Sequence, residues 1–218
     1  MGRLFILSAP SGTGKSTVAG KLLQQVDSLR RVVTATTRRP RPGEKDGVDY
    51  IFMTREEFER GIKEEVLSRE YLPGGVRWLT TGTPRDQVER NMKENVDSLL
   101  VIDVQGAFRV KEVFQEAVSV FLLPPSLEEL KRRMIARGYR DSNTEVRLEM
   151  AKKEIPCARF FDYVIINDFV DRAVELLRSI ILASRCERER VLGRLDALLH
   201  SEDVLSLLKG GRCYVKEA

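Results

Sequence analysis

Short apolar runs alternate along the chain with stretches of helical periodicity. Apolar runs of this length are typical of strands that are covered on both faces. Because helical patterns separate them, the sequence predicts an α/β domain with a parallel sheet and helices on both faces. The runs that we expect to form its strands are Leu4–Leu7, Val32–Ala35, Leu99–Ile102, Val118–Leu122 and Val164–Ile166.

Two segments interrupt this alternation and are interpreted as inserted lobes. Residues 34–83 are rich in Arg, Thr, Gly and Tyr and contain one expected helix at about 54–65, preceded by the capping box pattern Thr54-Arg55-Glu56-Glu57. Residues 126–150 are highly charged and open on a second such pattern, Ser126-Leu127-Glu128-Glu129. The core of the domain is then expected to comprise residues 3–33, 84–125 and 151–182.

The C-terminal part shows two apolar stripes at helical spacing. The first runs from Val170 to Ile181 and predicts an amphipathic helix that closes the domain. The second, from Val191 to Leu199, favours a helix packed back on the domain, with a dimer-forming helix as the alternative. Residues 183–218 are therefore expected to form a helical tail, and the protein to be a monomer or a homodimer.

Composition narrows the class of protein. With 218 residues, 42% hydrophobic and 32% charged, the chain suits one globular α/β domain with small insertions. No apolar run approaches the ~20 residues of a membrane span. The three cysteines have no metal-ligand spacing, which indicates reduced thiols in a cytoplasmic protein. A net charge of +4 suits an anionic ligand, and we expect neither nucleic acid nor a membrane as partner.

Candidate chemistry begins directly after the first expected strand. There the chain reads Ala9-Pro10-Ser11-Gly12-Thr13-Gly14-Lys15-Ser16-Thr17. In such a loop the glycines let backbone N–H groups turn toward phosphates, Lys15 reaches the β/γ oxygens and the Ser16 hydroxyl ligates Mg²⁺. Ala9 stands where the usual pattern has glycine, which is tolerable if its φ is negative. The segment predicts a nucleoside triphosphate site at a helix N-terminus.

A second constellation follows in the first inserted lobe. Arg38 and Arg41 lie three residues apart, are stiffened by two prolines, and are followed by Tyr50. Two guanidinium groups and a phenol in this arrangement could clamp a monophosphate through bidentate contacts.

The two motifs, in this order and at this spacing, resemble the guanylate kinases, whose pattern joins S-[AG]-P-S-G-x-G-K-[ST] to T-T-R-x-x-R-x-G-E-x-x-G-x-D-Y. The resemblance covers residues 3–182 and implies a P-loop kinase core with a GMP-binding lobe at 34–83 and a lid at 126–150. It also implies Mg²⁺-dependent phosphoryl transfer from ATP to GMP, yielding ADP and GDP, in purine nucleotide metabolism. Further matches are Gly82-Thr83-Pro84, Ile102-Asp103-Val104-Gln105-Gly106, Leu123-Pro124-Pro125-Ser126, Ala136-Arg137-Gly138 and Asp162 to Asp168.

The resemblance also implies roles for single residues. Phosphoryl transfer needs positioning and neutralisation of charge, and Lys15, Mg²⁺ and several arginines would supply it. Asp103 could contact the guanine edge or its surroundings, cap a helix or order water on Mg²⁺. The implied GMP phosphate ligands are Arg38, Arg41 and Tyr50, the implied guanine contacts are Thr34 and Thr83, the implied lid arginines are Arg137 and Arg147, and Asn167 is implied to lie near the adenine.

The segment before Thr83 departs from the family pattern. The family has a glutamate there that accepts hydrogen bonds from guanine, and Glu70 takes this place if one residue is inserted before it. Without that gap Ser68 takes the place instead. The family tyrosine before the glycine is replaced by Thr81, so the aromatic phosphate contact is either lost or supplied by Trp78.

Three functions therefore stay open. The first is an ATP:GMP phosphotransferase. The second is a non-catalytic guanylate-kinase-like module that binds proteins, although such modules commonly lack an intact phosphate loop. The third is a kinase of the same architecture whose acceptor base differs, because of the changes at Ser68 and Thr81.

Overall fold

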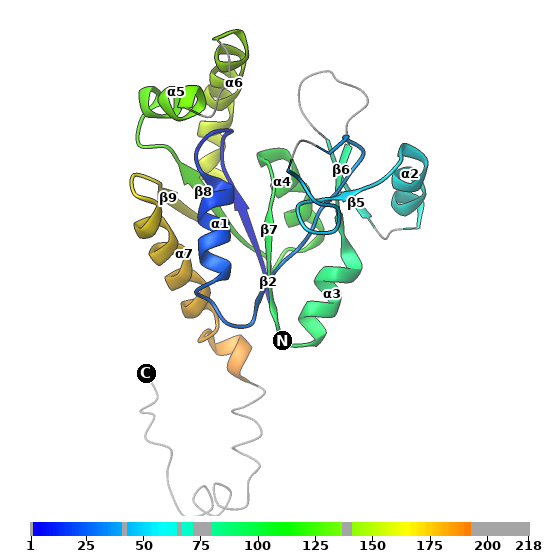
Figure 1. The fold of residues 1–218 in the computed structure, drawn as a ribbon. Helices are drawn as coiled ribbons and strands as arrows, with labels where there is room; N and C mark the ends of the chain where they lie inside the picture. Colours follow the sequence, from blue (N-terminus) through cyan, green and yellow to red (C-terminus); the bar gives the residue numbers. More distant parts are fainter. Residues whose placement is uncertain (1, 41–42, 65–66, 72–79, 137–140, 193–218) are drawn as a thin grey trace, which may run out of the picture. The chain divides into compact units, whose positions relative to one another are not determined.

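The computed structural model describes residues 2–40, 43–64, 67–71, 80–136 and 141–192. Residues 1–178 form one compact unit and residues 179–218 another. The first unit holds two sheets (Figure 1). The core sheet has five parallel strands, and β1, whose five residues are all buried, lies at its centre. In spatial order its strands are β2 (Leu29–Arg31), β7 (Asp97–Val101), β1 (Leu4–Ser8), β8 (Val118–Leu123) and β9 (Tyr163–Ile166).

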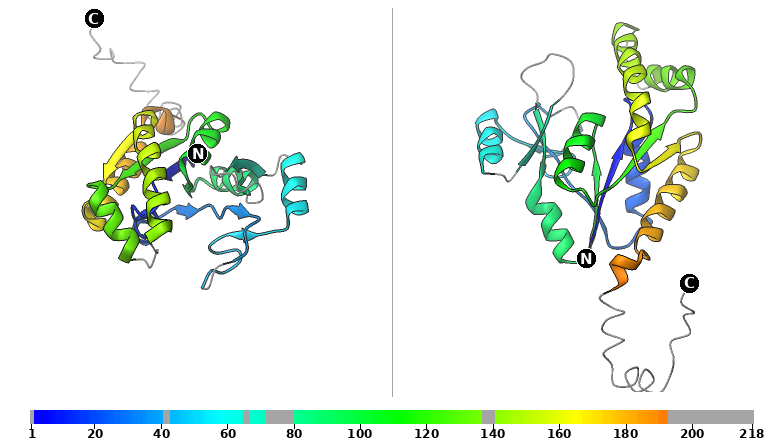
Figure 2. Two further views of the ribbon diagram at one scale, coloured as in Figure 1. Left: turned by 90° about the horizontal axis from the view of Figure 1, so that it is seen from above. Right: turned by 180° about the vertical axis from the view of Figure 1, so that it is seen from behind.

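The predicted parallel sheet with helices on both faces is confirmed. Helix α1 covers one face of the sheet and α4 the other (Figures 1 and 2). An ion pair of 2.6 Å between Lys21 and Asp171 places the start of α7 beside α1. The helices are α1 (Lys15–Leu23), α2 (Arg55–Lys63), α3 (Arg85–Lys93), α4 (Val104–Val113), α5 (Leu127–Ala136), α6 (Asp141–Glu154), the 3₁₀ helix η1 (Ile155–Phe160) and α7 (Val170–Ser184).

The apolar core explains why the central strand is so regular. Leu4 and Ile6 pack in one cluster with Val104 of α4 and Phe121 of β8. Because side chains alternate along a strand, Phe5 and Leu7 are directed to the opposite face, and they are fully buried too. Burying a side chain of this size contributes about 1.5–3 kcal/mol, so the sheet is a firm support for the loop that follows β1.

The expected strand at Val32–Ala35 is wrong. The core strand is β2 at Leu29–Arg31, and after the Val32 amide donates to the Leu99 carbonyl at 2.9 Å the chain leaves the core sheet. Val32 is buried in the core cluster, whereas Ala35 is buried in a separate cluster of the inserted lobe with Phe58. Residues 32–35 are mostly apolar because they connect the core of the main sheet to the core of the inserted lobe. Periodicity alone did not distinguish such a connection from a single strand.

The first inserted lobe is a small sheet with one helix. Its strands, in spatial order, are β4 (Ile51–Phe52), β3 (Ala35–Thr36), β6 (Thr80–Pro84) and β5 (Leu67–Tyr71). The pairs β3–β6 and β5–β6 are antiparallel, while β3–β4 is parallel. The expected helix is α2, and its capping box is confirmed. The Glu57 amide donates to Thr54 Oγ1 at 3.2 Å, and the Thr54 amide donates to Glu57 Oε2 at 2.7 Å.

Of the two hydrogen bonds in the second predicted capping box, one forms. The Glu129 amide donates to Ser126 Oγ at 3.0 Å, as predicted. The Glu129 carboxylate does not complete the box. It binds Arg132 and Arg133, each at 2.7 Å. A charged partner one turn along the helix offers the carboxylate a stronger hydrogen bond than the neutral N-cap amide does.

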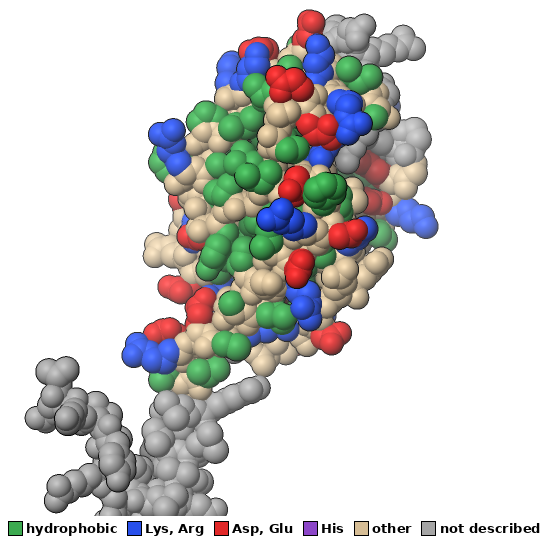
Figure 3. All heavy atoms as spheres, turned by 90° about the vertical axis from the view of Figure 1, so that its left-hand side faces the viewer, with side chains coloured by type: hydrophobic (Ala, Val, Ile, Leu, Met, Phe, Trp, Pro, Cys, Tyr) green, Lys and Arg blue, Asp and Glu red, His purple; other side chains and the backbone are tan. Residues whose placement is uncertain are grey.

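Strand β9 forms one edge of the core sheet and carries exposed apolar side chains. Tyr163, Val164 and Ile166 are 46%, 46% and 56% exposed. Figure 3 shows the face on the left of Figure 1, where apolar side chains gather among scattered charges. An exposed apolar edge is a place where another strand can pair. None of the helices in the described ranges combines the length and apolar character that a bilayer crossing requires.

Candidate active site

The loop between β1 and α1 depends on two glycines. Gly12 and Gly14 have φ angles of +90° and +102°, a region that side chains rarely adopt. A Cβ at Gly12 would lie 2.9 Å from Met134 Cγ of α5, and one at Gly14 would lie 2.8 Å from Asn167 Nδ2. Ala9 is buried and has no positive φ, so its methyl group is tolerated. The glycines are therefore needed both for the turn and for the close approach of α5 and Asn167.

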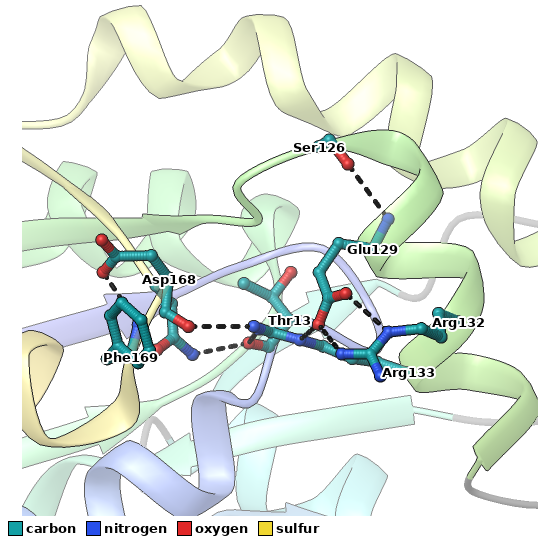
Figure 4. A network of polar contacts seen from close by, with 8 residues as sticks. Thr13, Ser126, Glu129, Arg132, Arg133, Asp168 and Phe169 are labelled. Carbon is teal, nitrogen blue, oxygen red and sulfur yellow. Dashed lines mark hydrogen bonds and ion pairs between the residues drawn. The ribbon is translucent and has the colours of Figure 1, made fainter.

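Two side chains hold the Thr13 carbonyl oxygen. Asn167 Nδ2 donates to it at 2.7 Å, and Arg133 Nη1 at 3.3 Å. Arg133 also donates to the Asp168 carbonyl at 3.3 Å and is paired with Glu129 (Figure 4). The two arginines beside Glu129 lower the pKa of its carboxyl group to about 2. The network ties α5 and the end of β9 to the loop. Arg133 was missed by the sequence analysis because it is one of many charged residues in an exposed-looking helix.

The charged insertion supplies a further contact to the loop. Arg147 Nη1 of α6 donates to Ser11 Oγ at 2.8 Å, across 136 positions of sequence. Arg137, its predicted companion, lies outside the described residues. A guanidinium group beside the loop adds positive charge where phosphate oxygens are expected.

Lys15 reaches the end of β7, and its charge acts on the Glu154 carboxylate at the end of α6. Its Nζ donates to the Ile102 carbonyl oxygen at 2.5 Å. The next residue, Asp103, caps α4 by accepting from the Gly106 amide at 2.8 Å, one of the roles left open for it. Burial, and to a lesser extent the negative charge of Asp103, raise the pKa of Glu154 to about 7, while Lys15 opposes the rise. Glu154 was not predicted, because nothing in its charged helix distinguishes it from its neighbours.

Three buried polar atoms at the loop have no hydrogen-bond partner within the part of the chain that the structure describes. They are Ser8 Oγ, Thr13 Oγ1 and Asn167 Oδ1. Buried polar groups are normally satisfied, so such a cluster indicates a place for water or a ligand. The Ser16 hydroxyl in the first turn of α1 is exposed. One protein hydroxyl suits Mg²⁺, which takes most of its oxygen ligands from water and phosphates. The residues present therefore fit a Mg²⁺-nucleotide complex.

Arg38 and Tyr50 meet in the inserted lobe. The Arg38 guanidinium lies 5.1 Å from the ring centre of Tyr50 and 5.6 Å from that of Phe52. Both carboxylate oxygens of Glu44 bind it at 2.9 Å, which raises the pKa of Arg38. A two-pronged ion pair fixes the plane of the guanidinium. Glu44 is thus a further part of the site, and its place between basic residues in the sequence did not distinguish it. Arg41 lies outside the described residues.

The small sheet brings together the predicted base contacts. Ala35 pairs with Gly82, so the neighbouring Thr34 and Thr83 lie at the same end of this strand pair, and both are buried. In β5, position 70 pairs with Thr81 and position 68 with Thr83. The two alternatives for reading the base are therefore two residues apart on one strand. Their side chains, and Trp78, lie outside what the structure describes.

Comparisons with known proteins agree with this architecture. The model of the guanylate kinase family matches residues 1–184. The chain is 45% identical to a guanylate kinase of Oceanobacillus iheyensis over 206 residues, covering 94% of this chain and 98% of that protein. It is 42% identical to a guanylate kinase of Bacillus subtilis, covering 92% and 98%. The crystal structure of guanylate kinase from Anaplasma phagocytophilum superposes with a TM-score of 0.75 at 35% identity, covering 93% of this chain and 96% of that one.

Proposed function

Because the chain belongs to the guanylate kinase family and is an ATP:GMP phosphotransferase, we propose that residues 9–17 bind ATP and that the lobe at residues 34–83 binds GMP. The observation that supports this division is that two arrangements suited to phosphate occur on different elements of the structure. One is the loop that ends in Lys15, and the other is Arg38, fixed over Tyr50 by Glu44. A reaction between two phosphorylated substrates needs both.

On the ATP side, the phosphates lie along the loop, and Lys15 neutralises the β/γ oxygens. The Ser16 hydroxyl would hold Mg²⁺, which would supply further neutralisation of phosphate charge when bound. Arg147 and Arg137 of the lid at residues 126–150 cover the transferred group, and the link from Arg147 to Ser11 supports this role. Asn167 lies at the adenine end, and its unsatisfied buried Oδ1 supports a polar ligand there.

On the GMP side, the arginines position the acceptor phosphate. Arg38 and Arg41 bind its oxygens and the Tyr50 hydroxyl donates to it. The base lies against the small sheet, near Thr34 and Thr83, with Glu70 accepting from the two adjacent N–H groups of guanine. Asp103, at the carboxyl edge of the core sheet, lies at the meeting point of the two substrates. Because the acceptor phosphate is already ionised, no general base is needed.

Composition and surface also support proposals on the location, partners and oligomeric state of the protein. We place it in the cytoplasm, since Cys157 and Cys186 are free thiols. We expect no nucleic acid or membrane partner. The protein is a monomer or a homodimer, and the exposed β9 edge is the first surface to examine for self-association. We further propose that the kinase domain comprises residues 3–182 and that residues 183–218 are a C-terminal tail, most of which, with nearly all of the predicted helix from Val191 to Leu199, lies outside the described residues.

The acceptor is tested by comparing four nucleoside monophosphates. Phosphoryl transfer from ATP is measured with GMP, AMP, dTMP and UMP, and the shift in melting temperature is measured with each, because a ligand stabilises the state that binds it. We expect transfer and stabilisation with GMP above the other three. A preference for another base would support the altered-acceptor alternative. Binding of GMP without transfer would support the non-catalytic module.

A further inference from the structure

A cavity lined by several arginines lies where the inserted lobe at residues 34–83 joins the core. Its volume is about 460 Å³, which is large enough for a nucleotide-sized ligand. Arg30 and Arg31 of β2 and Arg90 of α3 form the core side of its wall, and Gly47 and Ile51 form the lobe side. The lining residues within the described ranges include none of those assigned above to ATP or GMP.

The arginines of this cavity are held in place by their neighbours. Arg30 donates to Asn91 Oδ1 at 3.3 Å and is paired with Glu94. Asn91 is itself buried and donates to Ser98 Oγ of the core sheet at 3.0 Å. The Arg30 guanidinium is therefore held by a buried asparagine and a surface carboxylate, which reduces the side-chain entropy lost when a ligand binds.

The lining carries more positive than negative charge. Arg90 is paired with Asp86 at 3.3 Å, but the hydrogen bond of Arg31 goes to a neutral group, the Asp49 carbonyl, at 3.3 Å. Among the described residues that line the cavity are three arginines and one aspartate, and a second carboxylate, that of Glu94, is paired with Arg30. Such an excess favours an anion, and guanidinium groups match the oxygens of phosphate in particular.

The cavity also lies beside a pair of hydrogen bonds that joins Val33 to α3. The Val33 amide donates to Gln87 Oε1 at 3.1 Å, and Gln87 Nε2 donates to the Val33 carbonyl at 3.4 Å. Both residues line the cavity. The Gln87 side chain therefore joins α3, which follows the last strand of the lobe, to the segment around Val33, where the chain leaves the core sheet. A ligand there would contact core and lobe together.

We propose that this cavity is a binding site for a small phosphate-bearing anion, separate from the ATP and GMP sites. Arg31 supplies the main charge, and Arg30 and Arg90 supply further donors. The shared chemistry is the phosphate group. Its source is either an inorganic polyphosphate or a nucleoside diphosphate, and separate titrations distinguish the two.

Titration followed by NMR of the ¹⁵N-labelled full-length protein tests the proposal at each site separately. Inorganic pyrophosphate is added in one series and GDP in another, and the Val33 and Gly47 amides report on the cavity while Gly14 reports on the phosphate loop. We expect saturable shifts of Val33 and Gly47 with a midpoint different from that of Gly14. In Arg31→Gln the cavity midpoint should rise at least about tenfold, because a charge-assisted hydrogen bond is lost, while the Gly14 curve stays in place. Tighter cavity binding of GDP than of pyrophosphate identifies a nucleotide as the source; otherwise the phosphate groups alone are recognised.

Arg159→Gln is the matched control. Arg159 is also exposed, and its hydrogen bond likewise goes to a backbone carbonyl, that of Pro156, at 3.2 Å. This variant should leave both curves unchanged. The proposal is overturned if Val33 and Gly47 do not shift in the wild-type protein, if their shifts follow the Gly14 curve, or if Arg31→Gln leaves the cavity midpoint unchanged. Unchanged kcat in Arg31→Gln shows that the variant is folded.

Discussion

The side-chain Nδ2 of Asn167 donates to the backbone carbonyl oxygen of Thr13 at 2.7 Å. This hydrogen bond joins the end of β9 to the loop between β1 and α1 across 154 positions of sequence. The bond is buried, and the same nitrogen would lie 2.8 Å from a Cβ at residue 14. Loop conformation and the asparagine are thus coupled. A residue predicted to lie near the adenine is also a support of the loop.

Replacing Asn167 should impair the ATP-binding conformation of the loop more than it lowers the stability of the fold. In Asn167→Leu the Thr13 carbonyl loses a buried donor, which costs about 1–3 kcal/mol. We expect a higher KM for ATP and a lower free energy of unfolding, with the KM for GMP scarcely changed. Steady-state kinetics and urea unfolding measure both effects. An unchanged KM for ATP would show that the bond does not position the loop.

Removing the loop lysine should abolish transfer and leave the fold intact. Lys15 is only partly buried and its Nζ bonds a backbone carbonyl, so Lys15→Ala removes phosphate charge neutralisation without opening the core. Circular dichroism checks the fold and a coupled assay gives kcat. Lys21→Ala, on the same helix and paired at the surface with Asp171, is the control. Comparable kcat in folded Lys15→Ala would refute the assignment.

The fork shape of Arg38 should matter beyond its charge. Arg38→Lys keeps the charge but cannot bind two oxygens in one plane or stay flat over Tyr50. We expect the KM for GMP to rise about tenfold, with the KM for ATP unchanged. Arg39→Lys changes the exposed neighbour in the same way and should have little effect on either KM. If both variants raise the KM for GMP equally, the phosphate clamp is misplaced.

The base-reading position can be decided between two residues of β5. Glu70 pairs with Thr81 and Ser68 with Thr83, so both positions are compatible with the small sheet. If Glu70 accepts from guanine, Glu70→Gln should lower kcat/KM for GMP by one to several decades, an order-of-magnitude expectation from the cost of a lost charged partner. The KM for ATP should scarcely change. A silent Glu70→Gln together with a loss of discrimination against AMP in Ser68→Ala would assign the role to Ser68.

Stability of the nucleotide-free protein should depend on pH through Glu154. Its pKa is raised from 4.5 to about 7, so the folded state binds this proton more tightly than the unfolded chain does. The free energy of unfolding therefore falls as the pH rises from about 4.5 to about 7. Glu154→Gln removes this loss. The difference in free energy of unfolding between the variant and wild type should therefore be about 1–3 kcal/mol more favourable to the variant at pH 8 than at pH 4.5. Urea unfolding at several pH values measures the difference.

Glu149→Gln is the control for this pH series. Glu149 lies on the same helix, is 63% exposed and is paired with Lys152. Its replacement should change stability by a similar small amount at every pH. A pH profile of Glu154→Gln parallel to that of wild type would mean that the Glu154 carboxyl is not perturbed in solution.

Features that depend on short stretches of chain follow from the sequence alone. The phosphate loop, the capping box at Thr54 and the helix at Val170–Ser184 each rest on residues within a few turns of one another, where backbone conformation and local hydrogen bonds decide the structure. The alternation of apolar runs and helical patterns predicted the α/β class for the same reason. Two motifs in a fixed order, the loop at residues 9–17 and the Arg38–Tyr50 segment, indicated the kind of enzyme.

Tertiary structure decided what depends on residues far apart in sequence. Val32–Ala35 has the pattern of a strand, but two separate cores bury its ends. Glu129 has an arginine partner that competes with the capping box. Arg133 and Glu154 become part of the site only because their helices pack against the loop and beside Lys15. Burial and the fields of distant charges leave no mark on local periodicity, so these roles follow only from the folded chain.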